Sequence, residues 1–178
     1  MALKSTVYKA ELEIVDMDRH YYETHKLTLA RHPSETDERM MIRLLAFALN
    51  GHERLEFGKG ISDSDEPDLW LKDLTGAIEL WIEVGHPDSR VLSKAAGRSG
   101  EVRVYAYSAN PDRWWDPIAA DAGGLRNLAV FCVDADSSRR LAGLARASMK
   151  LQCSVQDGEI YFRDDEGGEV QVSMVRIR

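Results

Sequence analysis

The feature that most restricts the fold is a pair of alternating segments that meet at Thr75-Gly76. Between residues 66 and 85, apolar and polar side chains alternate on both sides of this dipeptide. A period of two is typical of a β-strand that buries one face. The segment therefore predicts an antiparallel hairpin with strands over about residues 68–74 and 77–84.

The length of the loop fixes which side chains face each other across this hairpin. A two-residue or four-residue loop sets Lys72 opposite Glu79, Trp70 opposite Trp81, and Asp68 opposite Glu83. The first two pairs would stabilise the hairpin by about 0.2–1 kcal/mol each. An odd loop length would break this register.

The third pair is electrostatically unfavourable. Two carboxylates about 5 Å apart repel by about 3 kcal/mol at an effective dielectric constant of about 20. Three explanations fit: Asp68 and Glu83 splay into water, one of them has a raised pKa, or a cation lies between them. Pro67 restricts the backbone that leads into Asp68, which favours a fixed position for that carboxylate.

Helical and strand patterns alternate along the rest of the chain. The sequence predicts a mixed α/β fold in a single domain over residues 1–178. The expected strands cover residues 6–14, 21–29, 54–57, 102–106 and 128–133, and three more form a C-terminal meander with turns at Asp157-Gly158 and Gly167-Gly168. The expected helices cover residues 34–50, 88–98, 114–119 and 137–150.

The helix over residues 34–50 supplies a possible third carboxylate. Ser34 is expected to cap it, and an apolar stripe indicates one buried face: Met41, Leu44, Leu45 and Ala48. Arg39 and Arg43 are expected to point away from this stripe, with Glu38 at its margin. Three carboxylates, of Glu38, Asp68 and Glu83, could therefore converge.

Composition excludes several classes of protein. The net charge is −7 over 178 residues, and residues 34–85 hold five Lys/Arg against twelve Asp/Glu, which argues against a protein that coats nucleic acid. No apolar run reaches the roughly 20 residues of a membrane span, and no signal peptide is evident. Cys132 and Cys153 lie in apolar, strand-like surroundings, which indicates buried thiols in a cytoplasmic protein.

Other motifs point to packing rather than to chemistry. The five histidines lack the spacing of a zinc site, and no glycine-rich phosphate loop follows a strand. Trp114-Trp115, beside Ile118, favours a core position over a base-stacking platform. His86 lies three residues after Glu83 and could touch a ligand there, although it also suits an ordinary loop.

The order helix with Glu38, three strands, helix and strand resembles the core of the PD-(D/E)XK nuclease superfamily. Pro67-Asp68 and Glu83-Val84-Gly85 stand at its signature positions. Three longer segments resemble the YaeQ family of bacterial proteins: residues 31–41, 66–70 and 72–76. The resemblance implies a restriction-endonuclease-like core over about residues 34–107, in a mixed central sheet with flanking helices, plus an N-terminal hairpin and a C-terminal β-meander.

The superfamily pattern implies a metal site. Asp68, Glu83 and the backbone carbonyl of Val84 would hold Mg²⁺, or Mn²⁺, while Glu38 would act from the first helix through a water or a second ion. Gly85 stands where the pattern has a lysine. Lys94 is the preferred substitute and Lys72, on the face of Asp68, the second choice. Alternatively, Arg90, Lys94 and Arg98 form one solvated ridge.

Two functions are therefore open. The first is a Mg²⁺-dependent phosphodiesterase or nuclease acting on nucleic acid, with Glu38, Asp68, Glu83 and Lys94 as catalytic residues. The second is a nuclease fold without turnover that serves as a binding or regulatory module. The retained carboxylates favour the first, whereas Gly85 and an acidic surface with one local basic cluster, Arg90, Lys94, Arg98 and Arg103, favour the second. The oligomeric state is not evident from the sequence.

Overall fold

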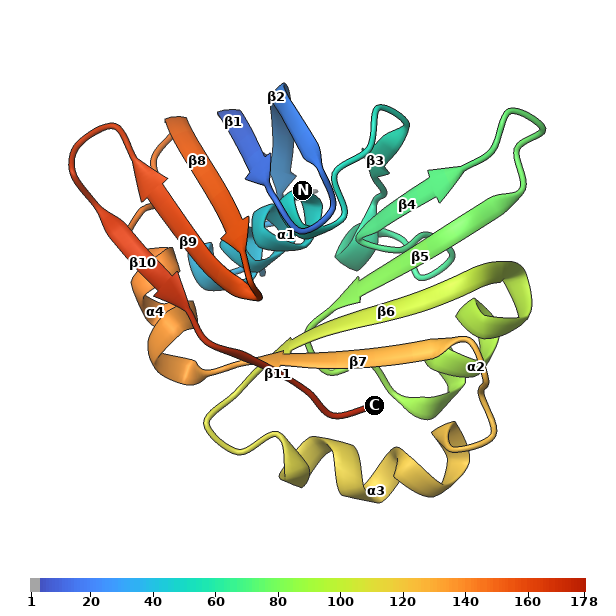
Figure 1. Ribbon diagram of the computed structural model, residues 1–178. Helices are drawn as coiled ribbons and strands as arrows, with labels where there is room; N and C mark the ends of the chain where they lie inside the picture. Colours follow the sequence, from blue (N-terminus) through green and yellow to red (C-terminus); the bar gives the residue numbers. More distant parts are fainter. Residues whose placement is uncertain (1–3) are drawn as a thin grey trace. The chain divides into compact units, whose positions relative to one another are not determined.

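The computed structural model describes residues 4–178, which fall into two compact units (Figure 1). The first unit contains the chain through Gly51 and Asp136–Ser173; the second contains His52–Ala135 and Met174–Arg178. The mixed α/β fold is confirmed, but the strands form two mixed sheets rather than one central sheet. That a single domain spans residues 1–178 stays a prediction.

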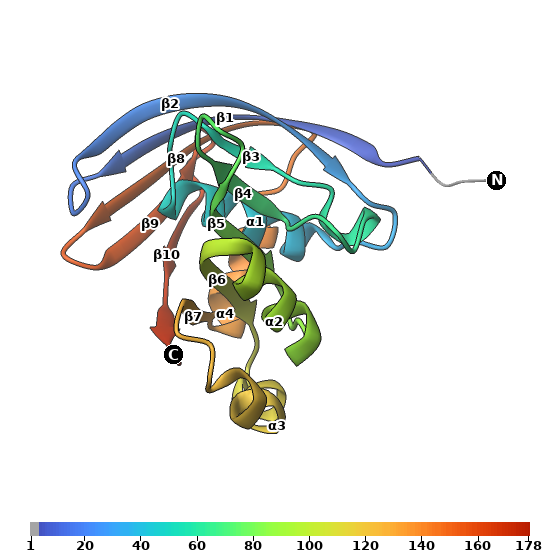
Figure 2. The same cartoon turned by 90° about the vertical axis from the view of Figure 1, so that its right-hand side faces the viewer.

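The first unit is built on a five-stranded sheet of order β10-β9-β8-β1-β2. Its strands are β1 (Thr6–Asp16), β2 (Tyr21–Arg31), β8 (Ser148–Gln156), β9 (Glu159–Asp164) and β10 (Glu169–Val172). The predicted N-terminal hairpin and C-terminal meander are confirmed. A parallel pairing of β1 with β8 joins them into one sheet, and Figure 2 shows these strands bending side by side.

The alternation along β1 shows which of its faces is buried. Ala10, Leu12 and Ile14 are at most 3% exposed, whereas Glu11 and Glu13 between them face solvent. A strand with one dry face must bury it against another layer. The same alternation continues along β8, where Met149, Leu151, Cys153 and Val155 are buried.

Two helices complete the first unit: α1 (Asp37–Leu49) and α4 (Ala135–Ala142), whose first residue belongs to the second unit. The prediction that Ser34 caps α1 is wrong. The Thr36 hydroxyl accepts the Arg39 N–H at 3.1 Å and so forms the N-cap, while the Ser34 hydroxyl lies 2.6 Å from His32 Nδ1.

The prediction that Arg43 points away from the buried face is also wrong. Residues 40–48 of α1 are all buried, and Arg43 is only 5% exposed. Its guanidinium donates two hydrogen bonds to the carboxylate of Glu35, at 2.6 and 2.7 Å. The helical pattern predicts that Arg43 faces solvent. Its charge is instead stabilised in the interior by the carboxylate of Glu35.

The predicted helix over residues 137–150 is too long. Helix α4 ends at Ala142, Gly143 follows it, and residues 148–150 already belong to β8. Met149 pairs with Ala10 of β1 rather than continuing a helical stripe. Pairing with a strand distant in sequence has overridden the local helical pattern.

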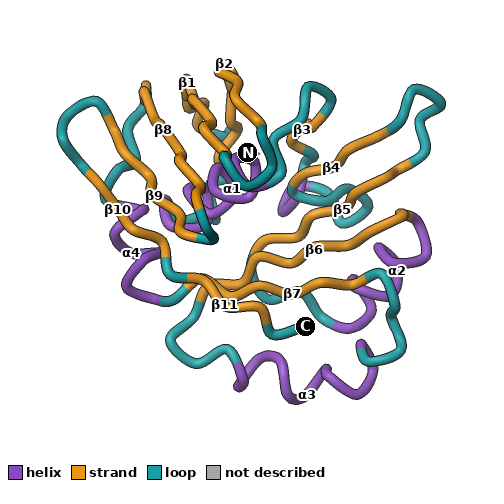
Figure 3. The backbone as a smooth tube through the Cα atoms, viewed as in Figure 1, coloured by secondary structure: helices purple, strands orange, loops and turns teal. Residues whose placement is uncertain are grey.

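The second unit is built on a six-stranded sheet of order β11-β7-β6-β5-β4-β3 (Figure 3). Its strands are β3 (Leu55–Phe57), β4 (Leu69–Lys72), β5 (Ile78–Val84), β6 (Ser99–Tyr107), β7 (Leu128–Val133) and β11 (Met174–Arg176). Strands β5, β6 and β7 are parallel, with crossovers through α2 (Ser89–Arg98) and α3 (Asp112–Ala122). The other neighbouring pairs are antiparallel.

The core of the second unit identifies the face of the sheet that the helices cover. Trp81 of β5, 1% exposed, packs in one cluster with Leu92 and Ala95 of α2 and with Trp115 and Ala122 of α3. The predicted core position of Trp114-Trp115 is therefore confirmed for Trp115, whereas Trp114 is partly buried against the cluster. No helix within residues 4–178 has the length and apolar character needed to cross a membrane.

Candidate functional site

The hairpin of β4 and β5 has the predicted register over its central pairs. Leu69 faces Ile82, Trp70 faces Trp81, and Leu71 faces Leu80. At the turn, Asp73 N–H donates to Ala77 O at 2.8 Å around a three-residue loop. A bulge after Leu71 compensates for this odd length and sets Lys72 opposite Ile78.

The predicted ion pair between Lys72 and Glu79 is therefore wrong. The Lys72 ammonium lies 3.7 Å from the ring centroid of Trp70, a cation–π contact. Glu79 instead pairs with Arg54 of the turn before β3, at 3.7 Å. The predicted aromatic pair is confirmed: Trp70 and Trp81 meet edge to face, with their centroids 6.2 Å apart.

Asp68 lies just before the first residue of β4 and is 1% exposed. Its backbone N–H donates to Ile82 O at 3.1 Å, and its Oδ2 accepts the Val84 N–H at 2.8 Å. The ladder pairs begin at Leu69, so Asp68 contacts the residues on both sides of Glu83 through these two hydrogen bonds.

The loop between β3 and β4 wraps closely around Asp68. Gly58 N–H donates to Asp68 O at 3.0 Å, and Gly60 N–H donates to Pro67 O at 3.1 Å. A Cβ atom at Gly60, which has a φ of +49°, would lie 2.5 Å from Asp68 Oδ1. Only glycine lets the backbone approach the carboxylate this closely.

Glu83 is held by its neighbour on the same face of β5. The indole Nε1 of Trp81 donates to Glu83 Oε1 at 2.7 Å. Because Trp81 packs against residues of α2 and α3, the Glu83 carboxylate belongs to the helix-covered face of the sheet. A strand places residues i and i+2 on one face, so the sequence already contained this signal.

The peptide between Val84 and Gly85 sets the direction of the third expected ligand. Gly85 N–H donates to Tyr105 O of β6 at 3.0 Å. No described peptide bond is cis, and a trans peptide directs its C=O opposite to its N–H. The Val84 carbonyl therefore points away from β6, toward the β4 side, where Asp68 lies.

Gly85 has a backbone that disfavours the lysine of the superfamily pattern. Its φ is +104°, and no atom lies within 4 Å of a Cβ built there. A side chain would have room, but residues other than glycine rarely adopt this conformation. The glycine that replaces the lysine of the pattern therefore suits the positive φ of the backbone at this position.

Lys94, the preferred substitute for the missing lysine, binds the acidic loop before β4. Its Nζ donates to Ser64 O at 3.1 Å and forms an ion pair with Asp65. The hydrogen bond from Lys94, and then its charge, lower the pKa of Asp65. That Lys94 takes part in catalysis stays a prediction.

Glu38 belongs to α1 in the first unit, where its Oε1 accepts a hydrogen bond from the Ser138 hydroxyl of α4. Among residues 4–178, no three His, Cys, Asp or Glu side chains form a group that could hold a metal ion. Of the three carboxylates that the sequence predicts for the site, Asp68 and Glu83 belong to the second unit. Joint action of Glu38 with these two stays a prediction.

An aromatic contact fixes the loop that follows Gly85. The His86 ring stacks on Trp114 of α3, with centroids 5.1 Å apart and planes 15° apart, and Trp114 Nε1 donates to Pro87 O at 3.0 Å. Burial lowers the pKa of His86. The sequence singled out His86 and Trp114 separately, but no local signal indicated that they meet.

Comparison with known proteins assigns the chain to a family. The model of the YaeQ protein family matches residues 1–174. The chain belongs to the YaeQ family. The YaeQ protein of Escherichia coli (strain K12) is 41% identical over 167 residues, covering 93% of this chain and 92% of that protein. The YaeQ protein of Salmonella typhi is 41% identical over 175 residues, covering 97% of each chain.

Solved YaeQ structures share the whole fold. The crystal structure of YaeQ from Xanthomonas axonopodis pv. citri matches with a TM-score of 0.92 and 46% identity, covering 98% of each chain. That of YaeQ from Pseudomonas syringae matches with a TM-score of 0.93 and 38% identity, covering 98% of this chain and 96% of the other. Within residues 4–178, the fold of this YaeQ family member thus consists of two mixed sheets and four α-helices.

Proposed function

We propose that this YaeQ protein is a Mg²⁺-dependent phosphodiesterase or nuclease of the PD-(D/E)XK type that acts on nucleic acid. One observation carries the proposal: the carboxylate of Asp68, 1% exposed, is bonded to the backbone directly beside Glu83. Burial of a carboxylate is costly unless hydrogen bonds or a cation stabilise its charge. The hydrogen bond from Val84 N–H offsets part of this cost, and a bound cation would offset more of it.

The topology of the second unit supports the proposal. Strands β3, β4 and β5 form an antiparallel meander, and helix α2 crosses over to β6, which is parallel to β5. With α1 before β3, the chain follows the order of elements in the restriction-endonuclease-like core. In open α/β sheets, ligands bind outside the carboxyl ends of parallel strands, which is where Glu83 and Val84 lie.

The donor atoms available beside β5 fit a hard divalent cation. Asp68 and Glu83 supply carboxylate oxygens and Val84 a carbonyl oxygen, and oxygen ligands are those that Mg²⁺ and Mn²⁺ prefer. A carboxylate has about four acceptor positions, so the bond from Val84 N–H is compatible with metal binding by Asp68. When bound, Mg²⁺ supplies charge stabilisation for a phosphodiester and lowers the pKa of an attacking water.

The other proposed catalytic residues act through charge and hydrogen bonding. Glu38 Oε1, which accepts from Ser138, is proposed to orient a water. The Lys94 ammonium is proposed to stabilise negative charge on the substrate phosphate, because the backbone at Gly85 disfavours a lysine. Trp81 positions Glu83 by the hydrogen bond to its Oε1.

Calorimetric titration with Mn²⁺ tests the proposed metal site. The wild-type protein should give a heat of Mn²⁺ binding. Asp68→Asn keeps the size of the side chain but removes its charge, and should abolish this heat. Asp63→Asn is the matched control, because it removes a carboxylate from the exposed loop before β4. Equal heats from wild type and Asp68→Asn would overturn the site.

A second candidate function is a binding or regulatory module without turnover. Two observations favour it. The φ of +104° at Gly85 disfavours a lysine there, and the ammonium of Lys94 is paired with Asp65 rather than available to a phosphate. Incubation with single-stranded and double-stranded DNA and RNA in Mn²⁺ distinguishes the two functions. Cleavage that is lost in Asp68→Asn and Glu83→Gln supports a nuclease; intact substrates throughout support a binding module.

A further inference from the structure

Helix α2 carries a row of basic side chains. Arg90, Lys94 and Arg98 follow one another at intervals of four residues, a spacing that aligns them along one side of a helix. All three residues are exposed, whereas Leu92 and Ala95 of the same helix are buried in the core. We call these three residues the α2 ridge.

An acidic segment of the same unit binds this ridge. It consists of residues 63–66 and contains Asp63, Asp65 and Glu66. Lys94 contacts it twice, through the carboxylate of Asp65 and the carbonyl of Ser64. Arg98 also lowers the pKa of Asp65 through its charge. The acidic segment therefore presents its negative charge to the middle of the ridge.

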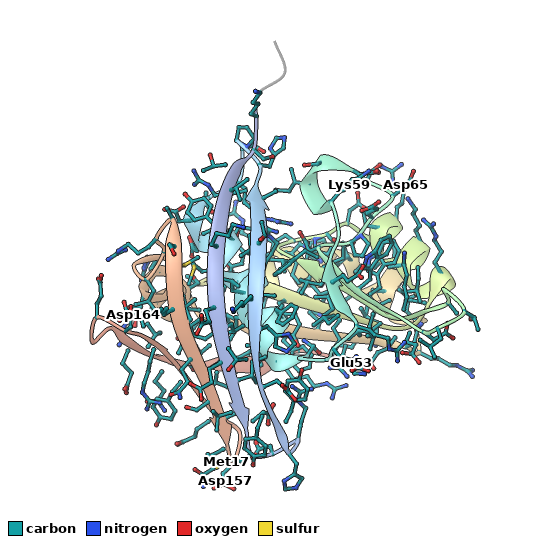
Figure 4. The ribbon with its side chains drawn as sticks, turned by 90° about the horizontal axis from the view of Figure 1, so that it is seen from above. Met17, Glu53, Lys59, Asp65, Asp157 and Asp164 are labelled. Atoms are coloured by element: carbon teal, nitrogen blue, oxygen red, sulfur yellow. The ribbon has the colours of Figure 1, made fainter. Side chains whose placement is uncertain are left out.

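Lys59 binds the acidic segment at both of its ends. Its ammonium lies 3.9 Å from Asp63 and 3.8 Å from Glu66, and its N–H donates to Glu66 Oε2 at 2.9 Å. Figure 4 shows Lys59 and Asp65 near each other, with Glu53 in a different part of the same unit. Lys59 thus holds the first and last residues of the segment, while Asp65, 74% exposed as a side chain, can exchange partners.

The α2 ridge is linked to the candidate metal site through side-chain contacts. The Arg98 guanidinium lies 5.6 Å from the ring centroid of Trp81, and the Trp81 indole donates to Glu83. Arg98, one helical turn after Lys94 on the ridge, is therefore linked through Trp81 to Glu83. An anion bound along the ridge would extend toward the carboxylates of the site.

We propose that the α2 ridge binds the phosphodiester backbone of a nucleic acid, and that Asp65 occupies the phosphate position at Lys94 until the substrate displaces it. This inference rests on the proposed function, since it names the substrate-binding surface of that site. It also accounts for a basic row in a chain of net charge −7, beside a segment with three acidic residues.

The energetics allow this exchange. Exposed ion pairs contribute little to stability, because water and salt screen them and both side chains lose freedom. A nucleic acid offers several phosphates at once, and each contact with a basic side chain releases condensed counterions. A polyanion is therefore expected to compete successfully with the single carboxylate of Asp65 for the ammonium of Lys94.

Binding of a fluorescein-labelled single-stranded oligodeoxynucleotide, measured by fluorescence anisotropy in EDTA, tests the proposal. Asp65→Asn should raise the affinity about two- to five-fold, because the competing charge is lost. Lys94→Gln should lower the affinity and reduce the slope of log Kd against log salt by about 0.7. In the double variant with Lys94→Gln, Asp65→Asn should not raise the affinity further, because the ammonium with which Asp65 pairs is absent. The same measurement is made with a labelled DNA duplex, and with inorganic phosphate as a competitor of the labelled single strand.

Glu53→Gln is the matched control, because it removes one exposed carboxylate of the same unit away from the ridge. Equal gains from Asp65→Asn and Glu53→Gln, or no gain from Asp65→Asn, would overturn the proposal. A gain that survives in the double variant would also overturn it. The measurement needs no metal ion, so failure of the Mn²⁺ titration, which counts against the proposed function, is distinguishable from failure of this binding test.

Discussion

The carboxylate of Asp68 accepts the backbone N–H of Val84 at 2.8 Å, at the end of the β4–β5 ladder. Pro67, the next residue outward, has no N–H, and its carbonyl is bonded to Gly60. The side chain of Asp68, rather than the main chain before β4, thus provides the acceptor for the Val84 N–H of β5. The same carboxylate is the principal proposed metal ligand, so variants must separate these two roles.

Asp68→Ala is expected to lower the free energy of unfolding by about 1–3 kcal/mol, because it leaves the Val84 N–H buried without this acceptor. Asp68→Asn keeps a carbonyl oxygen at the same position and should lose less. Urea denaturation of the two variants checks the difference. Similar losses would mean that the hydrogen bond to Val84 contributes little to stability.

Gly85→Lys, which restores the superfamily residue, is expected to destabilise the protein by about 1–2 kcal/mol because of the positive φ. Gly85→Ala should cost about as much, since a side chain there meets nothing within 4 Å and the cost lies in the backbone. Thermal and urea unfolding measure both.

Gly97→Ala in α2 is the matched control for Gly85. A Cβ there also meets nothing within 4 Å, but the residue is helical, so the same substitution should stabilise by about 0.5–1 kcal/mol. A stabilising effect of Gly85→Ala would contradict the assigned backbone conformation.

Glu35→Ala is expected to cost about 3–5 kcal/mol, because it leaves the guanidinium of Arg43 buried without its counter-charge. Glu35 also accepts from Arg39 at 2.9 Å. Asp37→Ala is the comparison: its ion pair with Arg31 is exposed and should cost less than about 1 kcal/mol. If both variants unfold at the same urea concentration, the buried pair is not the stabilising element inferred for α1.

Burial raises the pKa of the Cys153 thiol to about 12 and also raises that of Cys132. Both thiols should therefore resist Ellman's reagent at pH 8 in the folded protein and react after unfolding. In the unfolded chain, Cys153 ionises near its ordinary pKa of 9.0, so the free energy of unfolding should fall as the pH rises from 9.0 to about 12. This fall should be smaller in Cys153→Ala; an equal pH dependence would argue against the raised pKa.

Local apolar patterns and turn residues predicted the elements whose structure depends on neighbouring parts of the sequence. The strand at Leu128–Val133 and both hairpin turns of the C-terminal meander lie where the sequence indicates them. The facing of Trp70 and Trp81 was predicted from loop parity alone and holds because a bulge restores the register that the three-residue loop shifts. The error at Lys72 lies at that bulge.

The site could be predicted only as far as strands adjacent in sequence define it. Alternation along the hairpin placed Asp68 near Glu83, but the contact of Lys94 with Asp65 joins residues 29 positions apart and has no local signature. The end of α4 was missed for the same reason, since β8 depends on its parallel pairing with β1. Parallel pairing over such a separation leaves no turn signal in the sequence.

The register of β1 with β8, in which Lys9 faces Ser148, has a consequence for biosynthesis. When the ribosome has released the N-terminal hairpin, its central partner strand has yet to be translated. The contiguous stretch His52–Ala135 emerges and can collapse in the meantime. Because closing so wide a chain separation is slow, the five-stranded sheet is expected to be the last part of the nascent polypeptide to mature.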